Sequence, residues 1–153
     1  MMTQPEQLPL RLEHLIGTWS LIACEGRSST GEVLYLYGQE PVGMLMYDAK
    51  GYMSVMLMRP GRSPFASGDP LGGTPEEIRT AFEGFNAYCG RYTVNTSQGS
   101  VTHHLIASNF PNWEGTEQTR YATLSEDRLE LSAPPILARG VEWFFSLKWK
   151  RAS

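Results

Sequence analysis

The 153-residue sequence lacks the features that would direct it to a membrane or to nucleic acid. No apolar run approaches the roughly 20 residues of a membrane-spanning helix, and residues 1–14 lack the apolar core of a signal peptide. The 13 basic and 16 acidic residues are interspersed and give a formal net charge of −3, so no basic patch is visible. We therefore expect neither a membrane nor a nucleic acid as partner.

The sequence is also poor in residues that form disulfides, metal sites or cofactor loops. Its two cysteines, Cys24 and Cys89, are far apart and have no Cys-x-x-Cys neighbour, which is typical of reduced thiols in a cytoplasmic protein. There is no phosphate-binding glycine loop, Gly-x-Ser-x-Gly turn or His-Glu-x-x-His motif. His103 and His104 are adjacent, so a strand would turn them to opposite faces and prevent a shared metal site. We predict no metal and no cofactor.

What the sequence does contain is a succession of short strands and turns. Fifteen glycines and ten prolines break a chain that is 41% hydrophobic, and its length suits one domain. We expect a lead-in over residues 1–13 and one domain over residues 14–153. Regular short strands with turn signals indicate an all-β sandwich or barrel. The expected strands cover residues 17–25, 33–37, 43–47, 52–59, 87–95, 100–108, 116–124, 128–132 and 140–150.

One amphipathic helix interrupts these strands. Thr74 is a good N-cap, Pro75 suits the first helical position and Glu77 completes a capping box. The apolar stripe repeats at helical spacing up to about residue 86, and a loop over residues 60–73 precedes it. Such a helix would cover a barrel end or one side wall. The stripe consists of Ile78, Ala81, Phe82 and Phe85.

The segment from Val141 to Arg151 predicts how the sheet is arranged. Its odd positions are mostly bulky and apolar, including Trp143, Phe145 and Trp149, whereas its even positions are largely polar. Because successive side chains of a strand point to opposite faces, this strand has a buried face and a wet face. A short chain of such strands favours a sheet that closes on itself, and closed sheets of this size often hold one small ligand.

Two short motifs carry a resemblance to a known family. Gly17-Thr18-Trp19 on the first strand, with Trp149-Lys150-Arg151 on the last, resembles the lipocalin superfamily, in which a basic residue covers a tryptophan at the closed end of an eight-stranded barrel. The central part is similar to the bacterial and fungal lipocalin-like domain family. The matching segments are 51–54, 87–94, 101–104, 111–120 and 127–131.

The resemblance implies a single closed antiparallel barrel of about eight or nine strands, and the helix expected near residues 74–86 would be inserted into it. It also implies a small apolar ligand, because related barrels bind such molecules and some lipocalin-like proteins act as cofactor-free cyclases or isomerases. Secreted lipocalins lack the inserted helix, so their ligands are not transferred to this chain.

Strand parity selects the candidate site residues. In residues 101–108 the odd face is the more apolar, which turns His103 inward. His103 is then either a general acid/base or ligand contact, or a core histidine satisfied by a tyrosine or a carbonyl. Tyr88 and Tyr92 share one face and would line a ligand cavity or simply pack. The methionines of residues 44–58 would fill gaps or form a pliable pocket.

Arg120 also reads as inward-facing. Burying a guanidinium requires a partner, which would be Glu25, carbonyl groups or a ligand anion, unless Arg120 only closes a barrel end. Trp143 and Phe145 are expected to line the pocket, and Trp113 to cap its mouth or to staple a turn.

We therefore predict a protein that binds a small, largely apolar molecule with a polar or anionic group. The pocket would be formed by Tyr88, Tyr92, His103, Arg120, Trp143 and Phe145. Two alternatives stay open: a cofactor-independent cyclase, isomerase or lyase that uses His103, and a filled barrel with a structural role. A homodimer is also left open.

Overall fold

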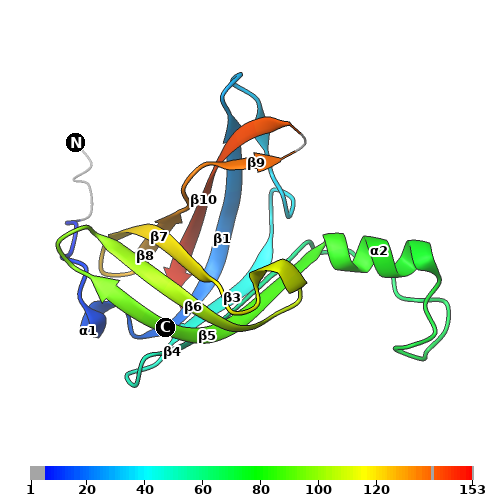
Figure 1. Cartoon of the computed structure of the whole chain (residues 1–153), viewed down its shortest axis with the longest axis horizontal. Helices are drawn as coiled ribbons and strands as arrows, with labels where there is room; N and C mark the ends of the chain where they lie inside the picture. The colour runs from blue at the N-terminus through cyan, green and yellow to red at the C-terminus, as the bar shows by residue number, and fades with distance from the viewer. Residues whose placement is uncertain (1–5, 139, 153) are drawn as a thin grey trace.

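A computed structural model describes residues 6–138 and 140–152 (Figure 1). Residues 1–5 of the predicted lead-in and Arg139 of the predicted turn over residues 133–139 lie outside the described residues. The helices are α1 (Leu12–Leu15), α2 (Pro75–Glu83) and the 3₁₀ turn η1 (Pro111–Trp113). The strands are β1 (Gly17–Ser28), β2 (Val33–Leu34), β3 (Val42–Tyr47), β4 (Tyr52–Met58), β5 (Phe85–Asn95), β6 (Ser100–Ser108), β7 (Glu117–Leu124), β8 (Arg128–Ser132), β9 (Ile136–Ala138) and β10 (Val141–Arg151).

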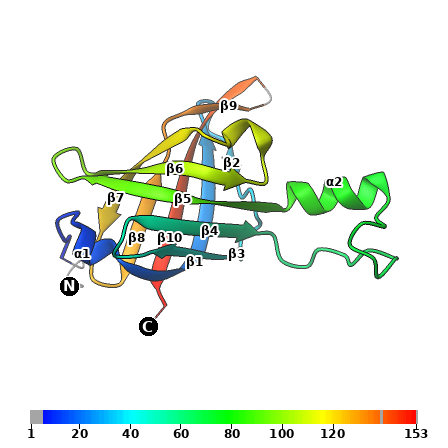
Figure 2. The same ribbon diagram turned by 60° about the horizontal axis from the view of Figure 1, so that its bottom comes forward.

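Eight of the strands form one closed antiparallel barrel. They follow the hydrogen-bonded order β1-β3-β4-β5-β6-β7-β8-β10, and β1 pairs with β10 to complete the circle. In this closing ladder Trp19 lies opposite Arg151 and Ser28 lies opposite Trp143. Figures 1 and 2 both show the first and last strands of the barrel, in blue and red, running side by side. The predicted all-β closed barrel with an inserted helix is confirmed.

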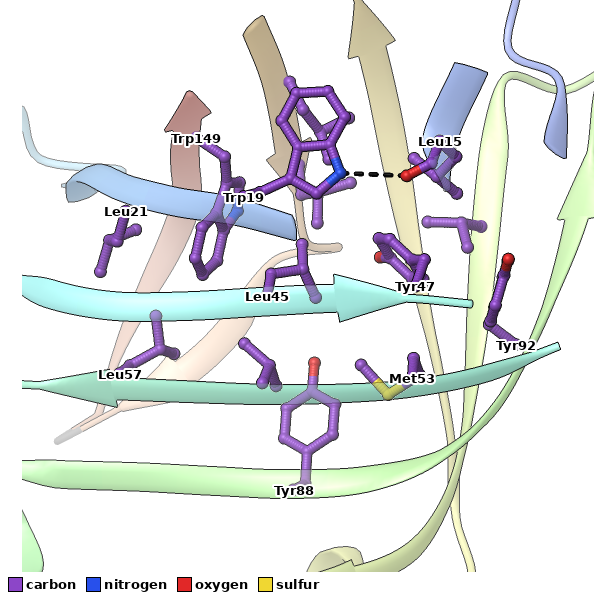
Figure 3. Packing of buried hydrophobic residues seen from close by; sticks show 14 of the residues in the cluster. Leu15, Trp19, Leu21, Leu45, Tyr47, Met53, Leu57, Tyr88, Tyr92 and Trp149 are labelled. Atoms are coloured by element: carbon purple, nitrogen blue, oxygen red, sulfur yellow. Dashed lines mark hydrogen bonds between the residues drawn. The ribbon is translucent and has the colours of Figure 1, made fainter. Parts of the chain in front are cut away.

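One end of the barrel is plugged by the two motifs that carried the family resemblance. The Trp19 indole is fully buried and donates a hydrogen bond to the Leu15 carbonyl, 3.0 Å away, drawn as the dashed line in Figure 3. The Arg151 guanidinium lies 4.1 Å from the centre of the Trp19 ring. It also donates to the carbonyls of Ile16 at 3.0 Å and His14 at 2.6 Å. Arg151 therefore ties the last strand to α1 and covers the indole through a cation–π contact.

The opposite end of the barrel is extended on one side. Beyond the eight-stranded circle, β2 pairs with the last part of β1, and β9 pairs with the first part of β10. The second strand was expected over residues 33–37, but only Val33 and Leu34 join the ladder. β9 lies within a segment that was expected to be a turn. Extra pairing at this rim covers the edges of β1 and β10, which would otherwise expose unpaired backbone groups.

A bulge in β1 changes which side chains point inward. The expected alternation placed Ala23 on the face of Trp19 and Leu21, but the pairing with β10 shifts register between Leu21 and Ala23. Cys24 is buried as a result, and Ala23 is not. A bulge inserts one residue into a strand, so every later side chain of that strand points to the opposite face. The alternation of apolar and polar residues in the sequence does not reveal where such an insertion occurs.

The methionine-rich strands β3 and β4 face outward more than the sequence suggested. Met53 is buried, whereas Met44, Met46 and Met56 are about half exposed on the outside of the barrel. The inward positions of β3 are taken by Leu45 and Tyr47 instead. The alternative that these methionines form a pliable ligand pocket is therefore wrong.

Helix α2 begins as predicted but does not cover the barrel. The Thr74 hydroxyl accepts a hydrogen bond from the Glu77 amide and the Glu77 carboxylate accepts one from the Thr74 amide, which completes the capping box. The helix ends at Glu83, so Phe85 belongs to β5. None of its residues is buried, and Figures 1 and 2 show it projecting away from the barrel beyond β4 and β5. The expectation that it covers an end or a wall is wrong.

None of the helices in the described part of the chain has the length and apolar character needed to span a membrane.

Candidate functional site

A hydrogen-bonded chain of three side chains lies inside the barrel. The His103 side chain, which strand β6 turns inward, is only 1% exposed. Its Nε2 lies 2.6 Å from the Tyr47 hydroxyl of β3, and its Nδ1 lies 2.9 Å from the Tyr88 hydroxyl of β5. In Figure 3 the Tyr47 and Tyr88 side chains point into the same interior from β3 and β5, on either side of β4. His103 thus has the tyrosine contacts of the core-histidine alternative, one on each ring nitrogen.

Burial keeps this chain uncharged. The lack of solvent lowers the pKa of His103 to about 3, and the charges of Arg120 and His104 act in the same direction. Burial also raises the pKa of Tyr47 and of Tyr88 above their usual value. At neutral pH the imidazole therefore carries one proton, so one ring nitrogen donates to a tyrosine oxygen and the other accepts from a tyrosine hydroxyl.

Arg120 of β7 is the charged group beside this chain. Its positive charge lies close enough to the Tyr88 hydroxyl to oppose the rise in the pKa of Tyr88. The guanidinium donates to the Thr119 carbonyl at 3.1 Å and to the Gln118 side-chain oxygen at 3.4 Å. Arg120 is half-buried rather than fully enclosed.

No carboxylate neutralises Arg120 within residues 6–138 and 140–152. Glu25, the partner considered from the sequence, lies 3.9 Å from Lys148 instead. The bulge in β1 precedes Glu25 and shifts its parity, which explains why the expected pairing is wrong. A half-buried guanidinium without a counter-ion retains donors for a ligand oxygen.

The inner wall around Arg120 is less tightly covered than the wall across the barrel. The inward-facing residues of β3 to β6, such as Leu45, Val55 and Leu105, are buried. On β7 and β10 the inward positions Gln118 and Leu147 are only half-buried. The ladder between β7 and β8 starts at Tyr121, so residues 117–120 pair only with β6. The interior is therefore less completely covered on the side of β7 than on the side of β3 to β6.

The other predicted site residues occupy separate places. The Tyr92 ring packs 4.6 Å from the Tyr47 ring, and its hydroxyl donates to the Asp48 carbonyl, so the hydroxyl is already used. Trp143 and Phe145 stack with ring centres 6.3 Å apart at the extended rim of the barrel. Trp143 is buried and Phe145 is half-buried. The structure therefore brings Tyr88, His103 and Arg120 together but leaves the remaining three outside this cluster.

An aromatic recess at the mouth of the barrel was not found from the sequence. It has a volume of about 220 Å³. Trp113 of η1 links it to the interior, because its ring packs edge-on against Tyr88 with centres 6.3 Å apart. The predicted role of Trp113 at a barrel mouth agrees with this position. The recess is lined by Tyr37, Phe82, Glu83, Phe85, Asn86, Asn109, Phe110 and Trp113.

Tyr47 and the mouth aromatics were missed for different reasons. Tyr47 shares inward parity with Leu45, so alternation within β3 could have identified it. Tyr37, Phe82 and Phe110 lie in a loop, a helix and a turn, where no periodic pattern predicts which surface they share.

Cys24 and His104 lie outside this cluster. Burial, assisted by the charge of Glu25, raises the pKa of Cys24 to about 12, which keeps it a thiol. His104 is half-exposed on the outer face, as predicted, with Nε2 3.0 Å from the Thr93 hydroxyl and Nδ1 3.2 Å from Glu117. Across the described residues, no three His, Cys, Asp or Glu side chains gather as metal ligands would.

Comparison with known proteins agrees with the barrel and its closed end. The family model described as "Lipocalin-like domain" matches residues 16–152. The chain therefore belongs to the lipocalin-like domain family. A curated relative from Aspergillus oryzae, the 4'-hydroxy-3'-methoxypropiophenone carrier protein, is 37% identical over 106 residues, which span 65% of this chain and 96% of that protein.

Proposed function

We propose that this protein binds a small aromatic molecule that enters through the mouth recess and places a hydrogen-bond-accepting oxygen against Tyr88 and Arg120. Membership of the lipocalin-like family and the similarity to a carrier protein support small-molecule binding in the barrel. The contact of a ligand oxygen with Tyr88 and Arg120 is supported by one observation. Arg120 has no carboxylate partner among the described residues and lies beside the uncharged chain Tyr47–His103–Tyr88.

The polarity of the chain suits an acceptor. When the His103 proton is on Nδ1, the Tyr88 oxygen accepts from His103 beside the positive charge of Arg120, and its own proton is free to point at a ligand. In the other tautomer the Tyr88 proton is used by Nδ1. A ligand oxygen that accepts from Tyr88 stabilises the first arrangement, and Tyr47 then donates to Nε2.

The mouth recess suits the aromatic part of the ligand. Rings from η1, α2 and β5 can contact a planar ring by stacking or edge-on packing. The ligand named for the relative is a ketone on an aromatic ring with a hydroxyl and a methoxy group. We call it the hydroxyketone and propose molecules of this kind as ligands.

The test is a comparison of two tyrosine variants. Tyr88→Phe removes the proposed donor, and Tyr52→Phe removes a hydroxyl from an exposed tyrosine on the outer face. Loss of one neutral hydrogen bond predicts a Kd for the hydroxyketone about 3–10-fold weaker in the first variant and unchanged in the second. Quenching of tryptophan fluorescence measures both. Failure of the hydroxyketone to bind the natural protein, or equal affinity of all three proteins, contradicts the proposal.

The same cluster bears on the alternative that the protein is an enzyme. A pKa of about 3 leaves His103 with little basicity at neutral pH, which disfavours the cofactor-free enzyme that would use it as a base. Conversion of the bound hydroxyketone, followed by absorbance, would revive that alternative. The homodimer and the cytoplasmic location stay predictions.

A further inference from the structure

We propose that the interior site binds its ligand as an anion, so that the ligand class is weakly acidic phenols and enols that give up a proton on binding. This inference rests on the proposed function and adds the charge state of the bound molecule. It depends on the hydrogen-bond donors and the charge that Arg120 and its neighbours present to a ligand oxygen.

The site around Arg120 offers donors to an oxygen and no strong acceptor. The guanidinium has only N–H groups, and the Tyr88 hydroxyl donates outward when His103 donates to it. The Gln118 side-chain oxygen is the nearest acceptor, and Arg120 already donates to it at 3.4 Å. With the His103 proton on Nδ1, a neutral phenol would keep an O–H with no good acceptor, whereas a phenolate oxygen can accept every hydrogen bond that the site offers.

The charge of the site favours the same form. The guanidinium is positive, no carboxylate of the described residues contacts it, and the titratable groups that face it from the packed strands are all neutral at pH 7. A negatively charged ligand oxygen would form an ion pair with the Arg120 guanidinium. The neutral groups on which the charge of Arg120 acts are Tyr47 on β3, Tyr88 on β5 and His103 on β6.

The ligand chemistry must allow ionisation near neutral pH. A phenol conjugated to a ketone spreads its negative charge onto the carbonyl oxygen and is therefore more acidic than the side chain of tyrosine. A nearby opposite charge commonly lowers the pKa of such an acid by about 1–3 units. Binding then breaks the phenolic O–H bond, leaves the electron pair on oxygen beside Arg120, and releases the proton to the bulk water.

The experiment follows the ionisation of the hydroxyketone directly. Its phenolate absorbs at longer wavelength than its phenol, so an absorbance titration between about pH 5 and pH 9 gives the midpoint in free solution and in the complex. We expect the midpoint in the complex to fall by at least about one pH unit, which is a tenfold preference for the anion. Calorimetry in two buffers of different ionisation enthalpy should report the release of up to one proton.

Two matched comparisons complete the test. The O-methyl ether of the hydroxyketone cannot ionise and should bind at least about tenfold more weakly than the hydroxyketone at pH 8. Arg120→Gln should abolish the shift of the midpoint, while Arg128→Gln, on the exposed outer face, should retain it. The midpoint in the natural protein tests the inference even if Arg120→Gln does not fold.

The outcomes separate this inference from the proposed function. An unchanged or raised midpoint, or equal binding of the ether and the phenol, overturns anionic binding and leaves a neutral-ligand carrier standing. If neither molecule binds the natural protein, the proposed function fails and anionic binding fails with it.

Discussion

His103 should make the stability of this protein depend on pH in a way that a single substitution removes. The pKa of His103 is about 3 in the folded protein because the ring is buried, whereas an unfolded histidine titrates near 6.5. Below about pH 6.5 the unfolded chain therefore binds a proton that the folded barrel refuses. The stabilisation is fully present above that pH and is lost as the pH falls toward 3. His103→Gln lacks this linkage.

The size of the effect follows from the difference between the two pKa values. Each pH unit below about 6.5 removes about 1.4 kcal/mol of unfolding free energy for one proton, so acidification from pH 7 to pH 4.5 removes about 3 kcal/mol. The full range down to pH 3 amounts to about 5 kcal/mol. Carboxylates also titrate in this range, but they do so equally in a variant that differs only at residue 103.

The assay is urea unfolding of three proteins at about six pH values between 4.5 and 7. At pH 7 the natural protein should exceed His103→Gln in stability, because the variant leaves one tyrosine hydroxyl unpaired. That advantage should shrink by about 3 kcal/mol at pH 4.5. His104→Gln, on the outer face, leaves the buried His103 in place and should therefore still lose stability as the pH falls. A constant difference between the natural protein and His103→Gln would refute the reasoning, because it would mean that His103 titrates normally when folded.

Three further substitutions test the barrel and the inserted helix α2. Arg151→Met removes a guanidinium that donates to two carbonyls and covers the Trp19 indole, so the free energy of unfolding measured with urea should fall by at least about 3 kcal/mol. Arg151→Lys should restore part of this free energy. Gly90→Ala would place a Cβ 1.9 Å from the His104 carbonyl oxygen and should cost about 2–4 kcal/mol, whereas Gly68→Ala, which has open space, should change little. Thr74→Ala should speed amide exchange in α2 without moving the global transition, because the helix packs so little on the barrel.

Alternation predicted the parts of the fold in which a strand runs without interruption. The inward set of β6, including Val101 and His103, and the bulky face of β10, including Trp149, lie where parity put them. The helix start at Thr74 was equally accessible, because a capping box is a local pattern of three residues.

Alternation failed where one residue was inserted or where a surface is assembled from several elements. The bulge after Leu21 exchanged the expected roles of Ala23 and Cys24 and moved Glu25 away from Arg120. Hydrophobicity misled in β3, because exposed methionines there look like core residues in the sequence. The contact of Arg120 with Tyr88 joins residues from β7 and β5, and such pairings become visible only when the register of every ladder is known.

The seam between β1 and β10 has a consequence for how the protein is made. Trp19 and Trp149 are neighbours in the barrel but are separated by about 130 residues of chain, which a ribosome needs roughly 7–26 s to add. Throughout that interval the edge of β1 and the indole that β10 later covers have no native partner. A slower rate of translation should therefore lengthen the exposure of this edge and indole without changing the stability of the finished barrel.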